Sequence, residues 1–538
     1  MKKTVVTLVV LGLSGHAFAQ PAPGHPAPGD QGSYAALVAF FAEWRQAQKP
    51  RVVAGVPDYT PAGVGALRGR LAAMRARFSE LSESGLTAAQ RIDRQLVESE
   101  MNGLDFDLSV LRPWSRNPAF YAMAIGSESD TPLREGPTIE GAIELWRFTP
   151  PLPPAQAEAL GQRLRAIPTL LAQARANLTE DARDLWLVGI RTHREQAEAL
   201  AAFAEALRPH HPQLLPDVER AREAEDAFRA WLEAGLAAKR GRSGVGRESY
   251  DWYVRHVHRL PYTWQDELVL MERELARALT GLALEEHRNR ALPPLEPAAS
   301  AAEWQQRAEA ALSYYMSFLR DKRVMTLRDY YEPALRARLG GFVPPDARDF
   351  FSEVDAREPL LLRCHGSHWF DLARMAQEPH PSPIRRVPLL YNMWDGRAEG
   401  LATGMEELML GAGLYAERPR SRELVYVMLA QRAARAIAGL RMHSNEWTIE
   451  EAVRFACERT PRGWLRPERE TVWFEQGLYL QQPGYGTSYL TGKAMIEELL
   501  AERARTLGPG FSLGGFMDEL NAAGMIPISL IRDEMAAK

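Results

Sequence analysis

The sequence contains almost no cysteine, and it has no excess of basic residues. Only Cys364 and Cys457 occur in 538 residues, so no disulfide framework holds the fold together. Either one bridge between them or two buried free thiols fits this pair. Lysine and arginine number 65 against 69 acidic residues, a formal net charge of -4. Because nucleic-acid binding requires a basic surface, this balance argues against a nucleic-acid partner.

Long apolar runs are missing as well, and the one short run belongs to the N-terminus. Lys2 and Lys3 precede it, and an Ala-Phe-Ala cleavage site ends at Ala19, which together are typical of a secretory signal peptide over residues 1–19. No segment reaches the ~20 apolar residues of a membrane helix. No cysteine follows the cleavage site, which argues against a lipid anchor. We therefore expect a periplasmic or secreted protein without a membrane anchor.

Residues 20–33, QPAPGHPAPGDQGS, are so rich in proline and glycine that we expect a disordered tether. From Tyr34 onwards, apolar residues recur at helical spacing and no series of alternating β-branched segments predicts a sheet. Pro168 is expected to kink or divide one of these helices. The sequence therefore predicts an all-α fold with little or no sheet.

A proline-rich stretch at residues 291–303 is either an internal seam or a loop between two helices. Within it, Ser300 and Glu303 have the spacing of a capping box, which predicts that a helix begins just after Ser300. Further along, a long helical pattern is expected to end at Gly508, with Pro509 beyond it.

Three familiar catalytic motifs are excluded by their context. Ser512 lies in a G-x-S-x-G sequence, but that nucleophile elbow requires a preceding strand, and here a helical pattern precedes it. The run from Gly486 to Lys493 has the wrong spacing for a phosphate-binding loop. None of the twelve histidines is followed by glutamate, so the H-E-x-x-H zinc-peptidase motif is absent.

The C-terminal half carries a series of phrases in a characteristic order. EGLATGME occupies residues 399–406, SRELVYVMLAQRAARAIAGLRMHSNEWTIEEAV residues 421–453, and PGYGTSY residues 483–489, before a closing GMIPISLI. Together they resemble the bacterial family called domain of unknown function 885, whose members show E-G-W-A-x-Y-x-E, G-W-T-x-E-x-A, P-G-Q-A-x-S-Y and G-x-x-P-L. The likeness extends from about Tyr34 to Met535.

This resemblance implies one large helical, metallopeptidase-like domain with a central cavity over residues 34–538. The family's zinc site is an H-E-x-x-P-G-H-H helix followed by the glutamate of E-G-W. Here Gly366-Ser367-His368 corresponds to P-G-H, which puts Leu362 and Arg363 at the H-E positions. Leucine cannot bind zinc and arginine cannot act as a general base, so the motif is degenerate. Leu401, Gly404 and Tyr485 also depart from the family pattern.

His368 and Glu399 match the family's ligand positions and are the predicted metal ligands. His365 is the candidate to replace the lost first histidine, since zinc usually takes three protein ligands and keeps one position open for water. Asp371, three residues after His368, is predicted to orient the imidazole from the second shell. Ser367 is expected to be the N-cap of the helix that carries His368 and Asp371. This set predicts Zn²⁺ as the cofactor.

Proton handling is a separate problem, because a positioned acid or base contributes typically ~10²–10⁴ in rate and Arg363 cannot act as one. The resemblance places Glu406, Tyr485 and Tyr489 near the site. We expect Glu406 or Tyr485 to take over part of this work, and Tyr489 to donate a hydrogen bond to a developing oxyanion.

Each of these residues also has a structural interpretation. His368 fits a hydrogen-bonded core residue, His365 a loop residue that caps a carbonyl, and Glu399 and Glu406 a solvated helix face. Three functions therefore stand. The first is an exported metal-dependent hydrolase, a peptidase or dipeptidase. The second is a divergent enzyme acting on a small peptide-like or natural-product substrate, and the third is a non-catalytic binding protein. A small peptide or peptide-like molecule is the expected partner.

Overall fold

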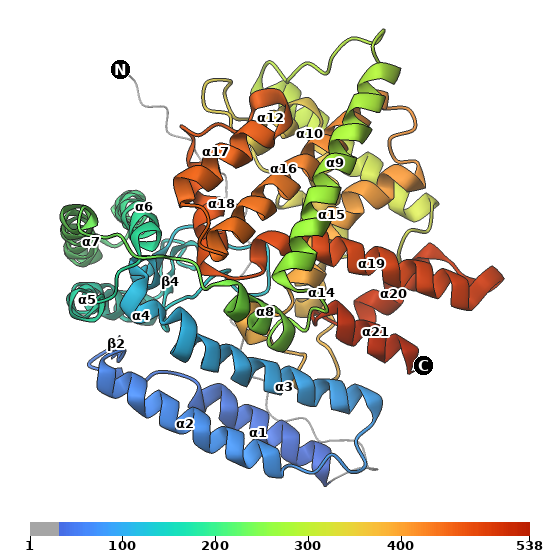
Figure 1. Cartoon of the computed structure of the whole chain (residues 1–538). Coiled ribbons are helices and arrows are strands. Elements are labelled where there is room, and N and C mark those ends of the chain that lie inside the picture. The colour runs from blue at the N-terminus through green and yellow to red at the C-terminus, as the bar shows by residue number, and fades with distance from the viewer. Residues whose placement is uncertain (1–31, 538) are drawn as a thin grey trace.

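The computed structural model describes residues 32–537, so the predicted signal peptide and nearly all of the predicted tether lie outside the described residues. Helices dominate this part of the chain (Figure 1). Its strands form only two short pairs. They are β1 (Val52–Val53) antiparallel to β2 (Val56–Pro57), and β3 (Ala124–Ile125) parallel to β4 (Ile143–Glu144). The predicted all-α fold class is confirmed.

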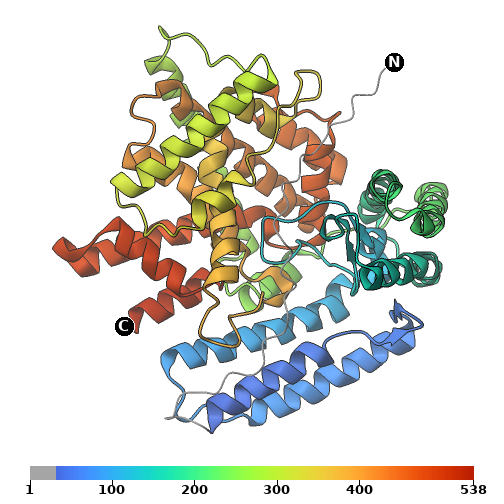
Figure 2. The ribbon, with the colours of Figure 1, turned by 180° about the vertical axis from the view of Figure 1, so that it is seen from behind.

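The first three helices form a layer along one edge of the molecule, which both views show (Figures 1 and 2). They are α1 (Ser33–Ala47), α2 (Pro61–Glu80) and α3 (Ala88–Phe106). The side chain of Thr60 caps α2 and a capping box formed by Thr87 and Gln90 begins α3. The indole of Trp44 donates a 2.8 Å hydrogen bond to the buried carboxylate of Glu100, which ties α1 to α3.

A second group of helices packs around its own hydrophobic core, beside the main body. Its members are α4 (Pro113–Arg116), α5 (Pro154–Asn177), α6 (Arg183–Leu207) and α7 (Leu215–Leu236). The predicted division at Pro168 is wrong, because α5 runs unbroken through it. Buried Leu164, Ile167 and Leu171 on either side of the proline hold the helix to its neighbours, and this packing outweighs the lost hydrogen bond.

The remaining helices pack around one central helix, α16 (Pro419–His443), whose residues are buried along most of its length. Together they form the main body. They are α8 (Arg247–His256), α9 (Trp264–Arg288), α10 (Ala301–Asp321), α11 (Tyr331–Arg336), α12 (Phe350–Arg357), α13 (Pro359–His365), α14 (Ser367–Gln377), α15 (Asp395–Ala412), α16 (Pro419–His443), α17 (Ile449–Arg459), α18 (Glu470–Gln481), α19 (Tyr485–Leu507), α20 (Leu513–Ala522) and α21 (Ile528–Ala536). Within residues 32–537, no helix combines the length and hydropathy needed to cross a bilayer.

Several helix ends agree with the expectations from sequence. The hydroxyl of Ser300 accepts the Glu303 N–H and begins α10, although the Glu303 carboxylate returns to the Ala299 N–H rather than to that of Ser300. Helix α19 ends at Leu507 with Gly508 as its C-cap. Ser512 caps α20 by accepting the Gly515 N–H, which gives its hydroxyl a structural role.

Close packing of α15 against α19 positions the site described next. A Cβ at Gly400 would lie 2.5 Å from the Cα of Gly492, so only glycine permits this approach. The two cysteines contribute nothing covalent to the packing: Cys364 is a buried free thiol and Cys457 a half-buried one. Of the two alternatives for this pair, the free thiols are the one observed.

Candidate functional site

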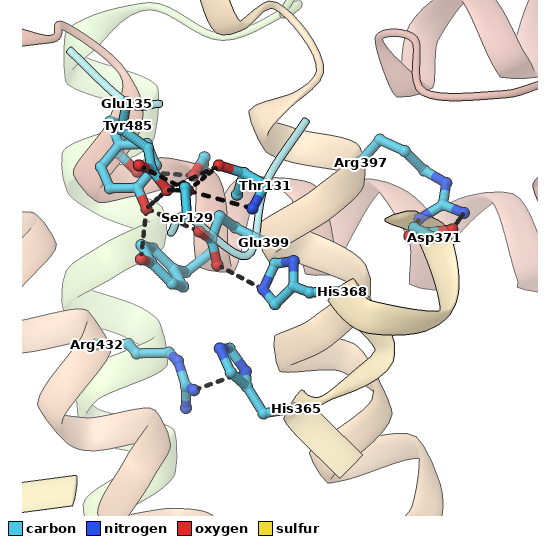
Figure 3. A network of polar contacts seen from close by, with 12 residues as sticks. Ser129, Thr131, Glu135, His365, His368, Asp371, Arg397, Glu399, Arg432 and Tyr485 are labelled. Carbon is cyan, nitrogen blue, oxygen red and sulfur yellow. Dashed lines mark hydrogen bonds and ion pairs between the residues drawn. The ribbon is translucent and has the colours of Figure 1, made fainter. Parts of the chain in front are cut away.

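The two histidines lie on either side of a break between two short helices. His365 is the last residue of α13 and His368 lies in the first turn of α14, and their ring centroids are 5.0 Å apart (Figure 3). The predicted N-cap role of Ser367 is wrong. Gly366 occupies the cap position and Ser367 is already the first residue of α14. The break brings both imidazoles to the same face.

Glu399 on α15 reaches the same place from a distant part of the chain. Its Oε2 lies 3.3 Å from Nε2 of His368, and both residues are only 2% exposed. Burial alone would lower the pKa of His368, but the carboxylates of Asp130 and Glu399 outweigh it and raise that pKa to about 9. Burial would raise the pKa of Glu399, yet the His368 imidazolium lowers it to about 2. The two predicted ligands thus form a tight buried pair.

Asp130 joins the histidines from a loop that the sequence did not single out. One donor atom each from Asp130, His365 and His368 lies within 4.8 Å of the others. Two imidazoles and a carboxylate are a donor set that suits zinc and related divalent ions. No spacing rule could have found Asp130, since it lies more than 200 residues before the histidines and outside any helix.

Asp371 lies away from the imidazoles (Figure 3). Its carboxylate accepts hydrogen bonds of 3.1 and 3.2 Å from Arg397 and one of 3.0 Å from Arg374. The predicted second-shell bond to His368 is absent from the described residues. Because Arg397 is fully buried, its charge requires a carboxylate partner, and Asp371 supplies it.

Glu406 takes the orienting position for the other histidine. Its two oxygens accept 2.8 Å hydrogen bonds from both terminal nitrogens of Arg432, and Oε1 also lies 3.2 Å from Nδ1 of His365. Burial alone would raise the pKa of Glu406, but the Arg432 guanidinium and His365 outweigh it and lower that pKa. A carboxylate held this firmly is a poor proton acceptor, so the geometry does not favour the predicted role of Glu406 as a general base.

The tautomer of His365 decides whether it can bind a metal. Nη2 of Arg432 lies 3.2 Å from Nδ1, as does the Glu406 carboxylate. When Nδ1 carries the proton and donates it to Glu406, Nε2 is free to coordinate an ion; when Nδ1 accepts from Arg432, Nε2 is protonated and cannot.

A chain of hydroxyl groups reaches Glu399 from α19. The phenol of Tyr485 donates a 2.8 Å hydrogen bond to Oε1 of Glu399, and Tyr489 donates to Tyr485 at 3.1 Å. Burial and the Glu399 charge raise the pKa of both tyrosines well above its usual value, so both are neutral donors. The two predicted tyrosines therefore lie beside the predicted ligand Glu399.

Glu135 is a second carboxyl group that sequence reasoning missed. It accepts hydrogen bonds from the hydroxyls of Ser129 and Thr131, and the Tyr485 phenol lies 3.4 Å from its Oε1 (Figure 3). Burial, followed by the nearby charge of Asp130, raises the pKa of Glu135. A carboxyl that holds a proton more readily than usual is suited to acid–base work.

Arg363 has a structural role. Its guanidinium donates to the backbone carbonyl of Leu339 at 3.1 Å and lies 3.3 Å from the carboxylate of Asp355. Because Arg363 is buried, this ion pair holds it in place. Arg363 is thus one half of a buried salt bridge.

Beside these groups lies a cavity of about 980 Å³ between α6 and the main body. His368, Glu399 and Glu406 lie behind its wall and do not line it. Its wall includes His365, Tyr485 and Tyr489, the loop that carries Asp130 and Glu135, and aromatic residues such as Trp369 and Trp473. Most arginines of the wall pair with carboxylates. The pairs are Arg191 with Glu470, Arg338 with Glu128, Arg363 with Asp355, Arg432 with Glu406 and Arg435 with Glu475. The cavity has a mainly apolar wall with charged groups of both signs, and it is large enough for a small molecule.

An all-α protein with imidazoles and carboxylates gathered beside one large cavity is the class that the fold and the geometry define. The chain belongs to the bacterial family described as "Bacterial protein of unknown function (DUF885)", which it matches over residues 50–284 and 367–535. His368 and Glu399 lie inside the matched segments, whereas Arg363 and His365 lie in the unmatched stretch between them. The predicted family membership is confirmed.

Two solved structures share the fold. One is described as a lipoprotein of unknown function from Shewanella oneidensis, with 14% identity, a TM-score of 0.68, and coverage of 94% of this chain and 100% of that one. The other is described as a lipoprotein from Colwellia psychrerythraea, with 15% identity, a TM-score of 0.67, and coverage of 94% and 99%. At this identity the likeness establishes the fold alone. A comparison with curated proteins finds no match.

Proposed function

We propose that this protein is an exported metal-dependent hydrolase that cleaves a small peptide or peptide-like molecule in the large cavity. The observation that carries the proposal is the convergence of His365, His368 and Asp130 within 4.8 Å, with Glu399 3.3 Å from His368, beside a 980 Å³ cavity whose wall includes His365 and Asp130.

The side chains fit a divalent ion. His368 and Glu399 each have a buried atom, Nε2 and Oε2, that lacks a hydrogen-bond partner of good geometry in the described part of the chain. Buried polar atoms rarely stay unpaired, and two of them that face one another suit a shared ion. His365, His368 and Glu399 would hold the ion, with Asp130 as a fourth donor. Glu406 would orient His365 through Nδ1, as carboxylates do behind many metal-binding histidines.

The remaining groups supply positioning and proton handling. A bound divalent ion would polarise a carbonyl and make water a better nucleophile. Tyr489 would turn its O–H from Tyr485 to the oxyanion that develops on the substrate, while Tyr485 holds Glu399. Glu135 is the carboxyl group best placed to exchange a proton, since Arg363 cannot and Glu406 is fixed by Arg432.

The charges of the cavity favour a small zwitterionic substrate. Arg134 and Glu195 both line the cavity, and neither forms an ion pair within residues 32–537. They are available to the carboxylate and the ammonium group of a short peptide. Export is supported by the N-terminal signal sequence and by the description of both structural neighbours as lipoproteins.

Metal analysis tests this function. The purified protein, loaded with Zn²⁺ and desalted, is expected to retain one equivalent, to lose it in His368→Ala, and to keep it in His287→Ala, which removes an exposed histidine of α9. Loaded wild type is expected to hydrolyse members of a dipeptide library. A protein that retains no metal but binds these peptides would refute the hydrolase and would support a binding protein.

A further inference from the structure

A second cavity, of about 360 Å³, lies behind the loop that carries Glu135. Arg134, Gly136, Pro137 and Thr138 contribute to the walls of both cavities, so this loop divides them. The volume is within the range of small-molecule sites. The candidate metal site is not part of it, and the proposed hydrolase assigns no role to it.

Asp107 is the unusual residue of this cavity. It is the first residue of a π-helix, η1 (Asp107–Leu111), which is a rare conformation often found at functional sites. Its carboxyl group lines the cavity and has no hydrogen-bond or ion-pair partner within residues 32–537. Burial raises the pKa of Asp107 to about 7. Asp107 is half-buried, and a carboxyl group at a cavity wall that no protein group engages is available to a ligand.

The backbone opposite Asp107 is strained. Tyr391 and Asn392 both line the cavity in the left-handed conformation, with φ of 59° and 48°. The side-chain amide of Asn392 donates to Gln482 at 3.1 Å, and the Tyr391 ring packs on Gly103, where a Cβ would lie 2.2 Å from it. Non-glycine residues in this conformation are strained and cluster at active sites and ligand clamps.

Aromatic rings surround the same space. Tyr59, Tyr253 and Tyr391 line it together with Trp114 and Phe120. Burial raises the pKa of the three tyrosines, and the charge of Asp107 raises it further, so they are neutral rings. A single carboxylate among aromatic rings is the arrangement that recognises organic ammonium groups, because both attract a weakly hydrated cation.

We propose that the second cavity binds an organic ammonium group, which Asp107 neutralises and the tyrosine rings enclose. The other charged residues of the wall leave this role to Asp107. Glu140 pairs with Lys49 at 3.2 Å and Glu144 pairs with Arg147. Arg134 also lines the wall, but its positive charge cannot neutralise an ammonium group.

The site makes a specific prediction about pH. Only the ionised form of Asp107 attracts a cation, so binding is weak below the pKa of Asp107, about 7, and reaches full strength above it. Asp107 is about half protonated at pH 7, so cation binding there releases about half a proton per cation. Replacing Asp107 by asparagine removes both the preference for a cation and its pH dependence while keeping the shape of the side chain.

Isothermal titration calorimetry on the full chain in EDTA tests the proposal, with choline as the cation and 3,3-dimethylbutanol as its neutral isostere. We expect wild type to bind choline about tenfold tighter than the alcohol, and choline to tighten between pH 6 and 8. Asp107→Asn is expected to lose both effects, whereas Asp105→Asn, which removes a half-exposed carboxylate of α3, keeps them. Circular dichroism verifies folding.

Equal binding of choline and its isostere, unchanged choline binding by Asp107→Asn, or absence of choline binding by wild type would each overturn the proposal. Because EDTA removes divalent ions, none of these results depends on the metal site. The metal analysis tests the proposed hydrolase function separately.

Discussion

Replacing Arg432 by methionine tests how the candidate site is held together. Arg432 is 1% exposed and Glu406 0% exposed, and two hydrogen bonds of 2.8 Å join them. Methionine fills much of the space of the arginine stem but leaves the Glu406 carboxylate buried without its cation. Breaking one side of a buried ion pair typically costs about 3–5 kcal/mol, and we expect a loss of this size in the free energy of unfolding.

Urea denaturation followed by circular dichroism measures this loss, with a control on the surface. Arg77 and Glu43 lie 2.7 Å apart, but their side chains are 51% and 55% exposed. Arg77→Met is therefore expected to cost no more than about 1 kcal/mol. Adding Glu406→Met to Arg432→Met removes the stranded charge and is expected to recover most of the stability. A cost for Arg432→Met equal to that of Arg77→Met, or a double variant less stable than the single one, would refute the reasoning.

Three further predictions concern the surroundings of the site. Tyr485→Phe removes the hydrogen bond to Glu399 and is expected to lower zinc affinity about 10–100-fold in a competition titration, whereas Tyr262→Phe, on the surface, leaves it unchanged. Gly400→Ala would place a Cβ 2.5 Å from the α19 backbone and is expected to lower the free energy of unfolding by more than about 2 kcal/mol. Gly411→Ala, which has open space on the same helix, is expected to raise it by up to about 1 kcal/mol. Equal effects of the two substitutions would contradict the close packing of α15 against α19. Native protein should expose at most Cys457 to a thiol reagent, with Cys364 reacting only after unfolding, and reductant should leave the melting temperature unchanged.

Local sequence signals predicted the helices well because their causes are local. The hydroxyl of Ser300 and the glycine at 508 act within one turn of the helix ends that they define. Pro168 does not divide α5 because packing against α7 outweighs one lost hydrogen bond. The helix that carries His368 begins one residue earlier than expected, so Ser367 lies inside it and Gly366 is its N-cap.

The candidate site was predictable only where a helix or a family phrase carried it. His368 and Glu399 correspond to positions in such phrases, and the structure brings them to 3.3 Å. Asp130 and Glu135 come from a loop whose path is set by tertiary packing, so neither periodicity nor spacing identifies them. The partner of Asp371 was mistaken because helix spacing favoured His368, whereas the buried charge of Arg397 decides the contact.

The most direct test of the central claim is anomalous diffraction at the zinc absorption edge from crystals of the zinc-loaded protein. The account predicts one strong peak within coordination distance, about 2.0–2.2 Å, of a nitrogen of His368 and a carboxylate oxygen of Glu399, with His365 or Asp130 as a further ligand. A structure from the same crystals with no peak at this site, or with zinc held only at the protein surface, would contradict it.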